Sequence, residues 1–176
     1  MYFDEDMVLD LRLNLLDKYV KKFVITESTY LHSGNKKKLN FDLKNFSKFK
    51  DKIEYIVIDH PPNDIKKINE EDNQDIKNSK MLDNSLKREN QQRNGLINGL
   101  KGVDDEDLIL VSDVDEIPNL KNLNLSKINN QIIIFEQKMF YYKLNLFYED
   151  FKWLGTKATK KKNFLSPQWL RNIKGK

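Results

Sequence analysis

Three carboxylates lie within four residues directly after an apolar run in the middle of the chain. Leu108 to Val111 are apolar, and Asp113, Asp115 and Glu116 come after them. A short apolar run bounded by turn residues is typical of a strand buried on both faces. On an extended chain, Asp113 and Asp115 would point to the same side with Cα atoms roughly 6.6 Å apart. Two such anions need a positive partner, and a divalent ion with oxygen ligands is the simplest one.

The same residues allow a plainer interpretation. Asp and Pro after a strand are common turn formers, and Asp113 could simply cap the next segment of the chain. We favour a metal-binding pair, Asp113 and Asp115, because the strand precedes it and Glu116 adds a charge that a turn does not need. An EF-hand loop is excluded, since Ile117 stands where an oxygen ligand is required. The motif would then lie at the carboxyl end of a strand, where open α/β sheets bind their ligands.

Helical and extended patterns alternate along the rest of the chain, which predicts an α/β fold with a mostly parallel central sheet. Apolar residues at helical spacing, together with capping residues, predict a first helix that begins near Asp4, Glu5 and Asp6 and runs to Val20, and further helices at 82–100, 120–128 and 167–173. Runs of β-branched, aromatic and other apolar residues predict strands at 23–27, 53–58, 108–111 and 131–142. The helix at 82–100 carries Glu89 and Arg93 in a stripe of leucines, a placement that suggests a polar network at the edge of a cleft.

Two polar segments are expected to be loops. Residues 63–79 are rich in Asn, Asp and Lys and poor in aromatic residues, so we predict a mobile polar loop or a poorly formed helix there. Lys36, Lys37 and Lys38 form a charge run of the kind that usually faces solvent, although a loop after a strand can also present a lysine to a ligand. Arg12 lies within an apolar helical face, where its stem could pass the core edge or its head could pair with a carboxylate or phosphate.

Length and composition limit the class of protein. A chain of 176 residues is one domain, 1–176, by its size, and 39% hydrophobic with 33% charged residues is within the soluble globular range. Without cysteine there is no disulfide or thiolate chemistry, which suits a cytoplasmic location. No apolar stretch reaches the about 20 residues of a membrane span, so only peripheral membrane contact stays open. A net charge of +4, with acids and bases interspersed, gives no reason to expect nucleic-acid binding.

An ordered series of motifs resembles glycosyltransferase family 17, the group that includes the bisecting β-1,4-N-acetylglucosaminyltransferases. The series centres on Ser112-Asp113-Val114-Asp115-Glu116-Ile117-Pro118. The other matching segments are the opening helix with Arg12, the strand with Glu27-Ser28, Ser33-Gly34 and the lysines, Asp59-His60-Pro61-Pro62, Arg88-Glu89, Gln92-Arg93-Asn94, Gly99-Leu100, Tyr141-Tyr142 with Asn145, Trp153, Gly155-Thr156 and Arg171.

The resemblance implies a GT-A-type, Rossmann-like sandwich and an inverting, metal-dependent transferase that moves N-acetylglucosamine from UDP-GlcNAc to a glycan acceptor. It assigns Mn²⁺ or Mg²⁺ to Asp113 and Asp115. It also implies a nucleotide-sugar site that contains Arg12, Glu27, Lys36, Arg93 and Asp113. The residues agree with this chemistry, since a divalent ion bridges a diphosphate well and basic side chains stabilise its charge.

An inverting displacement needs a carboxylate base at the acceptor hydroxyl. Glu116, Glu136 and Asp150 are candidates, with Glu116 placed first as the catalytic residue because it adjoins the metal pair. The family usually begins with a short strand and continues past the region of Arg171 with a Gly-Trp-His-like segment. This chain is therefore expected to be shortened at both ends.

Two alternatives differ in class. A HAD-type phosphatase also has a strand that runs into Asp-x-Asp, where the first Asp is the nucleophile and the second the general acid. That motif usually opens the chain and continues with Gly-Thr, whereas here the motif continues with Glu-Ile-Pro. The non-enzyme alternative is an inactive, truncated remnant that binds a sugar or nucleotide.

Overall fold

The structure is a computed structural model that describes residues 1–124, 127–143 and 145–175. The chain divides into two compact units, Met1–Asp4 with Lys22–Leu100 and Glu5–Lys21 with Lys101–Lys176. Both units contain helices and strands, so the α/β class is confirmed. A single domain over 1–176 stays a prediction.

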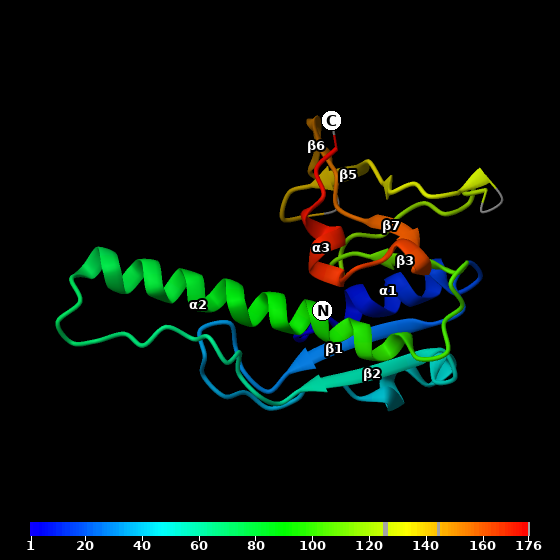
Figure 1. The fold of residues 1–176 in the computed structure, drawn as a ribbon. Helices are drawn as coiled ribbons and strands as arrows, with labels where there is room; N and C mark the ends of the chain where they lie inside the picture. The colour runs from blue at the N-terminus through cyan, green and yellow to red at the C-terminus, as the bar shows by residue number, and fades with distance from the viewer. Residues whose placement is uncertain (125–126, 144, 176) are drawn as a thin grey trace. The chain divides into compact units, whose positions relative to one another are not determined.

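The first unit is built on two parallel strands, β1 (Phe23–Ser28) and β2 (Ile53–Ile58), which pair in register from Phe23 with Ile53 to Ser28 with Ile58 (Figure 1). Both strands were predicted and both are confirmed. The 3₁₀ helix η1 (Leu43–Phe49) connects them and buries Phe46 and Phe49. Parallel strands need a long crossover connection, and these two aromatic side chains give this one a buried apolar contact.

A helix and a 3₁₀ turn complete this unit, α2 (Gln74–Asn94) and η2 (Gly95–Leu100). Two glycines let η2 lie directly against the sheet. A Cβ at Gly95 would come 2.4 Å from Ile58 Cδ1, and one at Gly99 would come 2.3 Å from Val24 Cγ1. Real Cβ atoms do not approach so closely, so both positions require glycine if η2 is to stay in place.

The face that α2 buries differs from the predicted leucine stripe. Leu82 and Leu86 are exposed, whereas Asn84, Gln92 and Arg93 are buried. The reason is hydrogen bonding to backbone. Asn84 accepts from the N–H of Lys66 and donates to its carbonyl, each at 2.8 Å, while the Gln92 amide donates to the Thr26 carbonyl at 3.1 Å. Polar side chains hold this helix where the pattern predicted apolar packing.

The polar segment predicted at 63–79 is shorter than expected, because α2 already begins at Gln74. Asn73 caps the helix by accepting a hydrogen bond from the N–H of Ile76. Residues 63–73 contain no helix or strand. Part of the segment is held against α2 by two kinds of contact. The Asn84 side chain forms two hydrogen bonds with the backbone of Lys66, and Lys87 forms an ion pair with Asp64 at 3.1 Å.

The second unit begins with α1 (Asp6–Leu16), which buries Leu9, Leu13 and Leu16 on one face as the spacing predicted. Its three-stranded sheet has the order β3 (Leu108–Val111), β7 (Lys157–Lys160) and β4 (Ile133–Ile134). Strand β7 was not predicted, because Lys157-Ala158-Thr159-Lys160 resembles an exposed basic tail. In the structure, Ala158 and Thr159 are fully buried.

The expectation of a mostly parallel central sheet is not met by the described strands. Strand β7 pairs antiparallel with both β3 and β4, and β5 (Gln137–Phe140) pairs antiparallel with β6 (Phe147–Trp153). Only β1 and β2 pair in parallel among the residues that the structure describes. The prediction was wrong because buried β3 resembles a parallel strand, yet here it lies at the edge of a small antiparallel sheet.

The β region predicted at 131–142 is divided into β4 and β5, and many aromatic side chains of the β5–β6 hairpin are exposed. The chain then enters α3 (Pro167–Asn172), where Ser166 accepts a hydrogen bond from the N–H of Trp169 as the predicted cap. The helix expected at 120–128 includes Leu125 and Ser126, which lie outside the described residues. No helix in the described part of the chain has the length and apolar character needed to cross a membrane.

Candidate acidic site

The three carboxylates of the central motif lie in a turn. Strand β3 ends at Val111, and the N–H of Glu116 donates to the Asp113 carbonyl at 3.2 Å, which closes the turn. The extended geometry expected for Asp113 and Asp115 is therefore wrong, and strand alternation does not aim their side chains to the same side. The Asp115 side chain is exposed and that of Asp113 is partly exposed.

The side chain of Arg12, which comes from α1, holds this turn by binding main-chain carbonyls of the turn. Its guanidinium donates to the Glu116 carbonyl at 2.6 Å and the Asp113 carbonyl at 3.2 Å, and it also binds the Ser112 hydroxyl. Burial lowers the pKa of Arg12 to about 10, against the opposing effect of the nearby carboxylates, so the group stays charged at neutral pH. Arg12 therefore reaches the acidic motif as the sequence allowed, but it binds main-chain carbonyls and a hydroxyl there.

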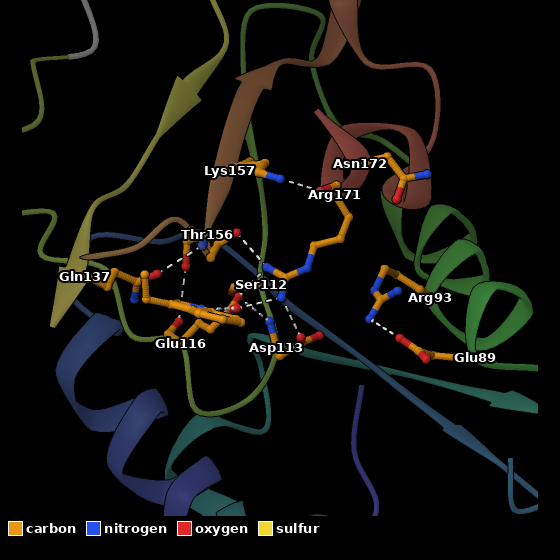
Figure 2. A network of polar contacts seen from close by, with 12 residues as sticks. Glu89, Arg93, Ser112, Asp113, Glu116, Gln137, Thr156, Lys157, Arg171 and Asn172 are labelled. Atoms are coloured by element: carbon orange, nitrogen blue, oxygen red, sulfur yellow. Dashed lines mark hydrogen bonds and ion pairs between the residues drawn. The ribbon is translucent and has the colours of Figure 1, made fainter. Parts of the chain in front are cut away.

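Arg171 from α3 meets the carboxylates of the same turn (Figure 2). Its two terminal nitrogens bind the two oxygens of Glu116 at 2.6 and 2.8 Å in a bidentate pair. One nitrogen also donates to Asp113 at 2.8 Å, and the other donates to the Gly155 carbonyl at 2.6 Å. Burial opposes the charged form of Arg171, but the hydrogen bond to Glu116 and the nearby acids outweigh it and raise the pKa.

Glu116 is the most enclosed acid of the turn, with a side chain only 5% exposed. Besides Arg171, it accepts from the Trp153 indole at 2.7 Å and from the N–H of Asp113 at 2.9 Å. A Cβ at Gly155 would come 2.4 Å from the Glu116 carboxylate, so only glycine permits this approach. The sequence identified Glu116 as an acid beside the metal pair but gave no sign of this enclosure.

The start of β7 supplies the remaining contacts. The hydroxyl of Thr156 donates to the Glu116 carbonyl at 3.3 Å, and its N–H donates to the Gln137 side chain at 2.9 Å. The ammonium of Lys157 donates to the Arg171 carbonyl, and its pKa is lowered by burial and by the charge of Arg171. Strand β7 thus connects the acidic turn, the β5–β6 hairpin and α3.

Glu27, expected in the nucleotide-sugar site, lies in the first unit and is fully buried at the end of β1. Its carboxylate binds the Lys37 ammonium and accepts from the N–H of Asn40 at 2.7 Å, the N–H of Phe41 at 3.1 Å and the Tyr55 hydroxyl at 2.8 Å. Burial alone raises the pKa of Glu27, but these four donors outweigh it and lower the pKa. Glu27 therefore fixes the loop after β1.

The other expected residues of the first unit differ in exposure. Lys36 is exposed in the loop after β1. Arg93 is buried, and it pairs with Glu89 at 2.8 Å as the helical spacing predicted. Roles of Glu27, Lys36 and Arg93 toward a nucleotide sugar stay predictions.

The acidic turn fits a divalent ion by the chemistry of its donors. Asp113 and Asp115 offer carboxylate oxygens, and Mg²⁺ typically takes one or two carboxylates together with substrate phosphates and water. No group of three or more His, Cys, Asp or Glu side chains able to hold a metal is found within 1–124, 127–143 and 145–175.

Sequence reasoning found the acidic motif, Arg12 and the Glu89–Arg93 pair. Arg171, Trp153, Gly155 and Thr156 entered only through the resemblance, and Lys157 and Gln137 were missed. An internal lysine beside alanine and threonine gives no local signal of burial, because the partners that satisfy it come from a distant helix.

Comparison with known proteins agrees with the motif. The model of glycosyltransferase family 17 matches residues 1–165 of the chain. No curated protein and no solved structure matches it. Since the family model covers nearly the whole chain, this protein belongs to glycosyltransferase family 17.

Proposed function

We propose that the protein is a metal-dependent, inverting glycosyltransferase that moves N-acetylglucosamine from UDP-GlcNAc to a glycan acceptor. Family membership supports glycosyl transfer and favours it over the phosphatase alternative. The observation that carries the metal-dependent part is the acidic turn after β3, which Arg12 and Arg171 hold from two helices. A GT-A-type sandwich is part of the same proposal.

In the proposed reaction, a carboxylate base takes the proton of an acceptor hydroxyl, and that oxygen attacks the anomeric carbon of the sugar. The bond from the anomeric carbon to the diphosphate oxygen breaks, so the configuration inverts and UDP leaves. A bound Mn²⁺ or Mg²⁺ supplies neutralisation of the charge that develops on the diphosphate. Asp113 and Asp115 would hold that ion, and the Arg12 guanidinium keeps the turn in place by binding the carbonyls of Asp113 and Glu116.

Neighbouring residues shield part of the turn from solvent. Glu116 within the turn and Thr156 beside it are buried, and the Trp153 indole donates a hydrogen bond to one oxygen of Glu116. Electrostatic interactions are stronger where water is excluded, so fixed charges at this position act more strongly on a diphosphate than they would in bulk solvent.

The experiment is a melting curve of the purified protein with Mn²⁺ and UDP, followed by sugar release from labelled UDP-GlcNAc with and without acceptor. We expect Mn²⁺ with UDP to raise the melting temperature and Asp115→Ala to abolish the rise. Exposed Asp10 on α1 provides the matched control for stability, as Asp10→Ala removes a carboxylate outside the turn. No shift in the parent protein would overturn the proposal. A shift without sugar release would identify an inactive binding remnant.

A further inference from the structure

The proposed function leaves open whether Glu116 is the catalytic base or a residue that orients the other side chains of the turn. The hydrogen-bond donors around its carboxylate distinguish these two roles. A carboxylate has about four lone-pair directions. One oxygen of Glu116 accepts from Arg171 and Trp153, at 2.6 and 2.7 Å. The other oxygen accepts from Arg171 and the N–H of Asp113, at 2.8 and 2.9 Å. All four directions are therefore taken.

A general base must reach the proton that it removes with a free lone pair. Glu116 has none left, and its side chain is only 5% exposed. An acceptor hydroxyl could displace one of these donors only by leaving a charged or buried partner unsatisfied. The backbone of Gly155 lies close against the carboxylate, since a Cβ there would come 2.4 Å from it.

The same contacts connect Glu116 to the proposed metal ligands. It fixes the backbone of Asp113 through the N–H, and it fixes Arg171 through the bidentate pair. Arg171 then holds the Asp113 side chain through Nη2, which donates to Asp113 Oδ2 and to Glu116 Oε1. Both the main chain and the carboxylate of Asp113 are thus positioned through one buried acid.

We propose that Glu116 is a positioning residue, which through Arg171 and the Asp113 N–H presets the acidic turn for a divalent ion and a nucleoside diphosphate. This role rests on the proposed function and changes one assignment within it. The base is then one of the other carboxylates, and Glu136 and Asp150 are the remaining candidates. Both are on or beside the β5–β6 hairpin, and both are more exposed than Glu116.

The test compares Glu116→Gln with the exposed control Glu149→Gln from β6. Mn²⁺ affinity in the presence of UDP is measured by calorimetry, and donor KM, kcat and the pH profile of kcat are measured separately. Substitutions behind a metal ligand typically weaken metal binding about 10–100-fold. We expect at least about a tenfold loss of Mn²⁺ affinity and a raised donor KM in Glu116→Gln, with the acid limb of the pH profile retained.

A catalytic base would give the opposite result. Parental Mn²⁺ affinity in Glu116→Gln, with a collapsed kcat and loss of the acid limb, would show that Glu116 is the base. If Glu116→Gln does not fold, Arg171→Lys is measured in the same way, because it keeps the charge and loses the bidentate pair. Unchanged Mn²⁺ affinity in Arg171→Lys would overturn the positioning role. Absence of Mn²⁺ and UDP binding in the parent would instead refute the proposed function.

Discussion

Replacing Glu27 by glutamine should destabilise the first unit strongly. Glu27 is fully buried, and its carboxylate satisfies Lys37, two backbone N–H groups and the Tyr55 hydroxyl. Glutamine keeps the size of the side chain but replaces one acceptor oxygen by an NH₂ group. That group cannot accept the hydrogen bonds that the replaced oxygen accepted, so their donors lose their partner. Lys37 also loses the charge that pairs with it, and its side chain is only 10% exposed.

The magnitude can be worked out from these contacts. Removing one partner of a buried ion pair costs about 3–5 kcal/mol, and leaving a buried donor unsatisfied costs about 1–3 kcal/mol. Lys37 keeps a hydrogen bond to the Lys38 carbonyl at 2.9 Å, which offsets part of the loss. We therefore expect the free energy of unfolding to fall by about 3 kcal/mol, a decrease of roughly 6–12 °C in melting temperature for a chain of this length.

The assay is urea unfolding followed by circular dichroism, with Glu54→Gln as the matched control. Glu54 lies on neighbouring β2, but its ion pair with Lys22 is long, at 3.7 Å, and largely exposed. The control should change stability by less than about 0.5 kcal/mol. If Glu27→Gln were as stable as the control, the buried contacts of Glu27 would not stabilise the loop after β1.

Acid should narrow the difference between the parent and Glu27→Gln. The pKa of Glu27 is lowered in the folded protein from its ordinary value of 4.5. A carboxyl group whose pKa is lowered by folding stabilises the folded protein fully at pH values above its pKa in the unfolded chain. This stabilisation is lost as the pH falls through its pKa in the folded protein. Glutamine does not titrate, so the stability gap measured at neutral pH should shrink below about pH 4.5. A gap that stays constant with pH would show that the charge of Glu27 does not stabilise the fold.

Three further predictions concern separate elements. Gly99→Ala should lower the free energy of unfolding by about 1–3 kcal/mol in urea titrations, because its Cβ would overlap a valine methyl of β1; unchanged stability would mean that η2 can move away. Ser166→Ala should cost about 1 kcal/mol in the same titration through loss of the α3 cap, and Ser166→Asp should restore it. The Glu106 carboxyl should titrate in NMR spectra near 2, since Lys160 and Lys162 lower its pKa to about 2, and high salt should move the pKa back toward 4.5.

The sequence alone predicted most elements that depend on local pattern. Helix α1, strands β1, β2 and β3 and the Ser166-Pro167 start of α3 carry their own periodicity or capping residues, so nearby residues are enough to specify them. The acidic motif after β3 was equally visible, because the abrupt change from apolar to charged residues marks the end of the strand by itself.

The tertiary structure decided what those residues contact. Buried polar positions in α2 and the buried lysine of β7 violate simple patterns, because hydrogen bonds from distant segments satisfy them. The pairing direction of β3 also depends on β7, which lies far along the chain from it. The chemical role of Glu116 likewise depends on contacts that the sequence does not predict. Its position beside the expected metal pair put it first among three candidate bases, and only the fold brings Arg171 and Trp153 to its oxygens and fills every acceptor direction.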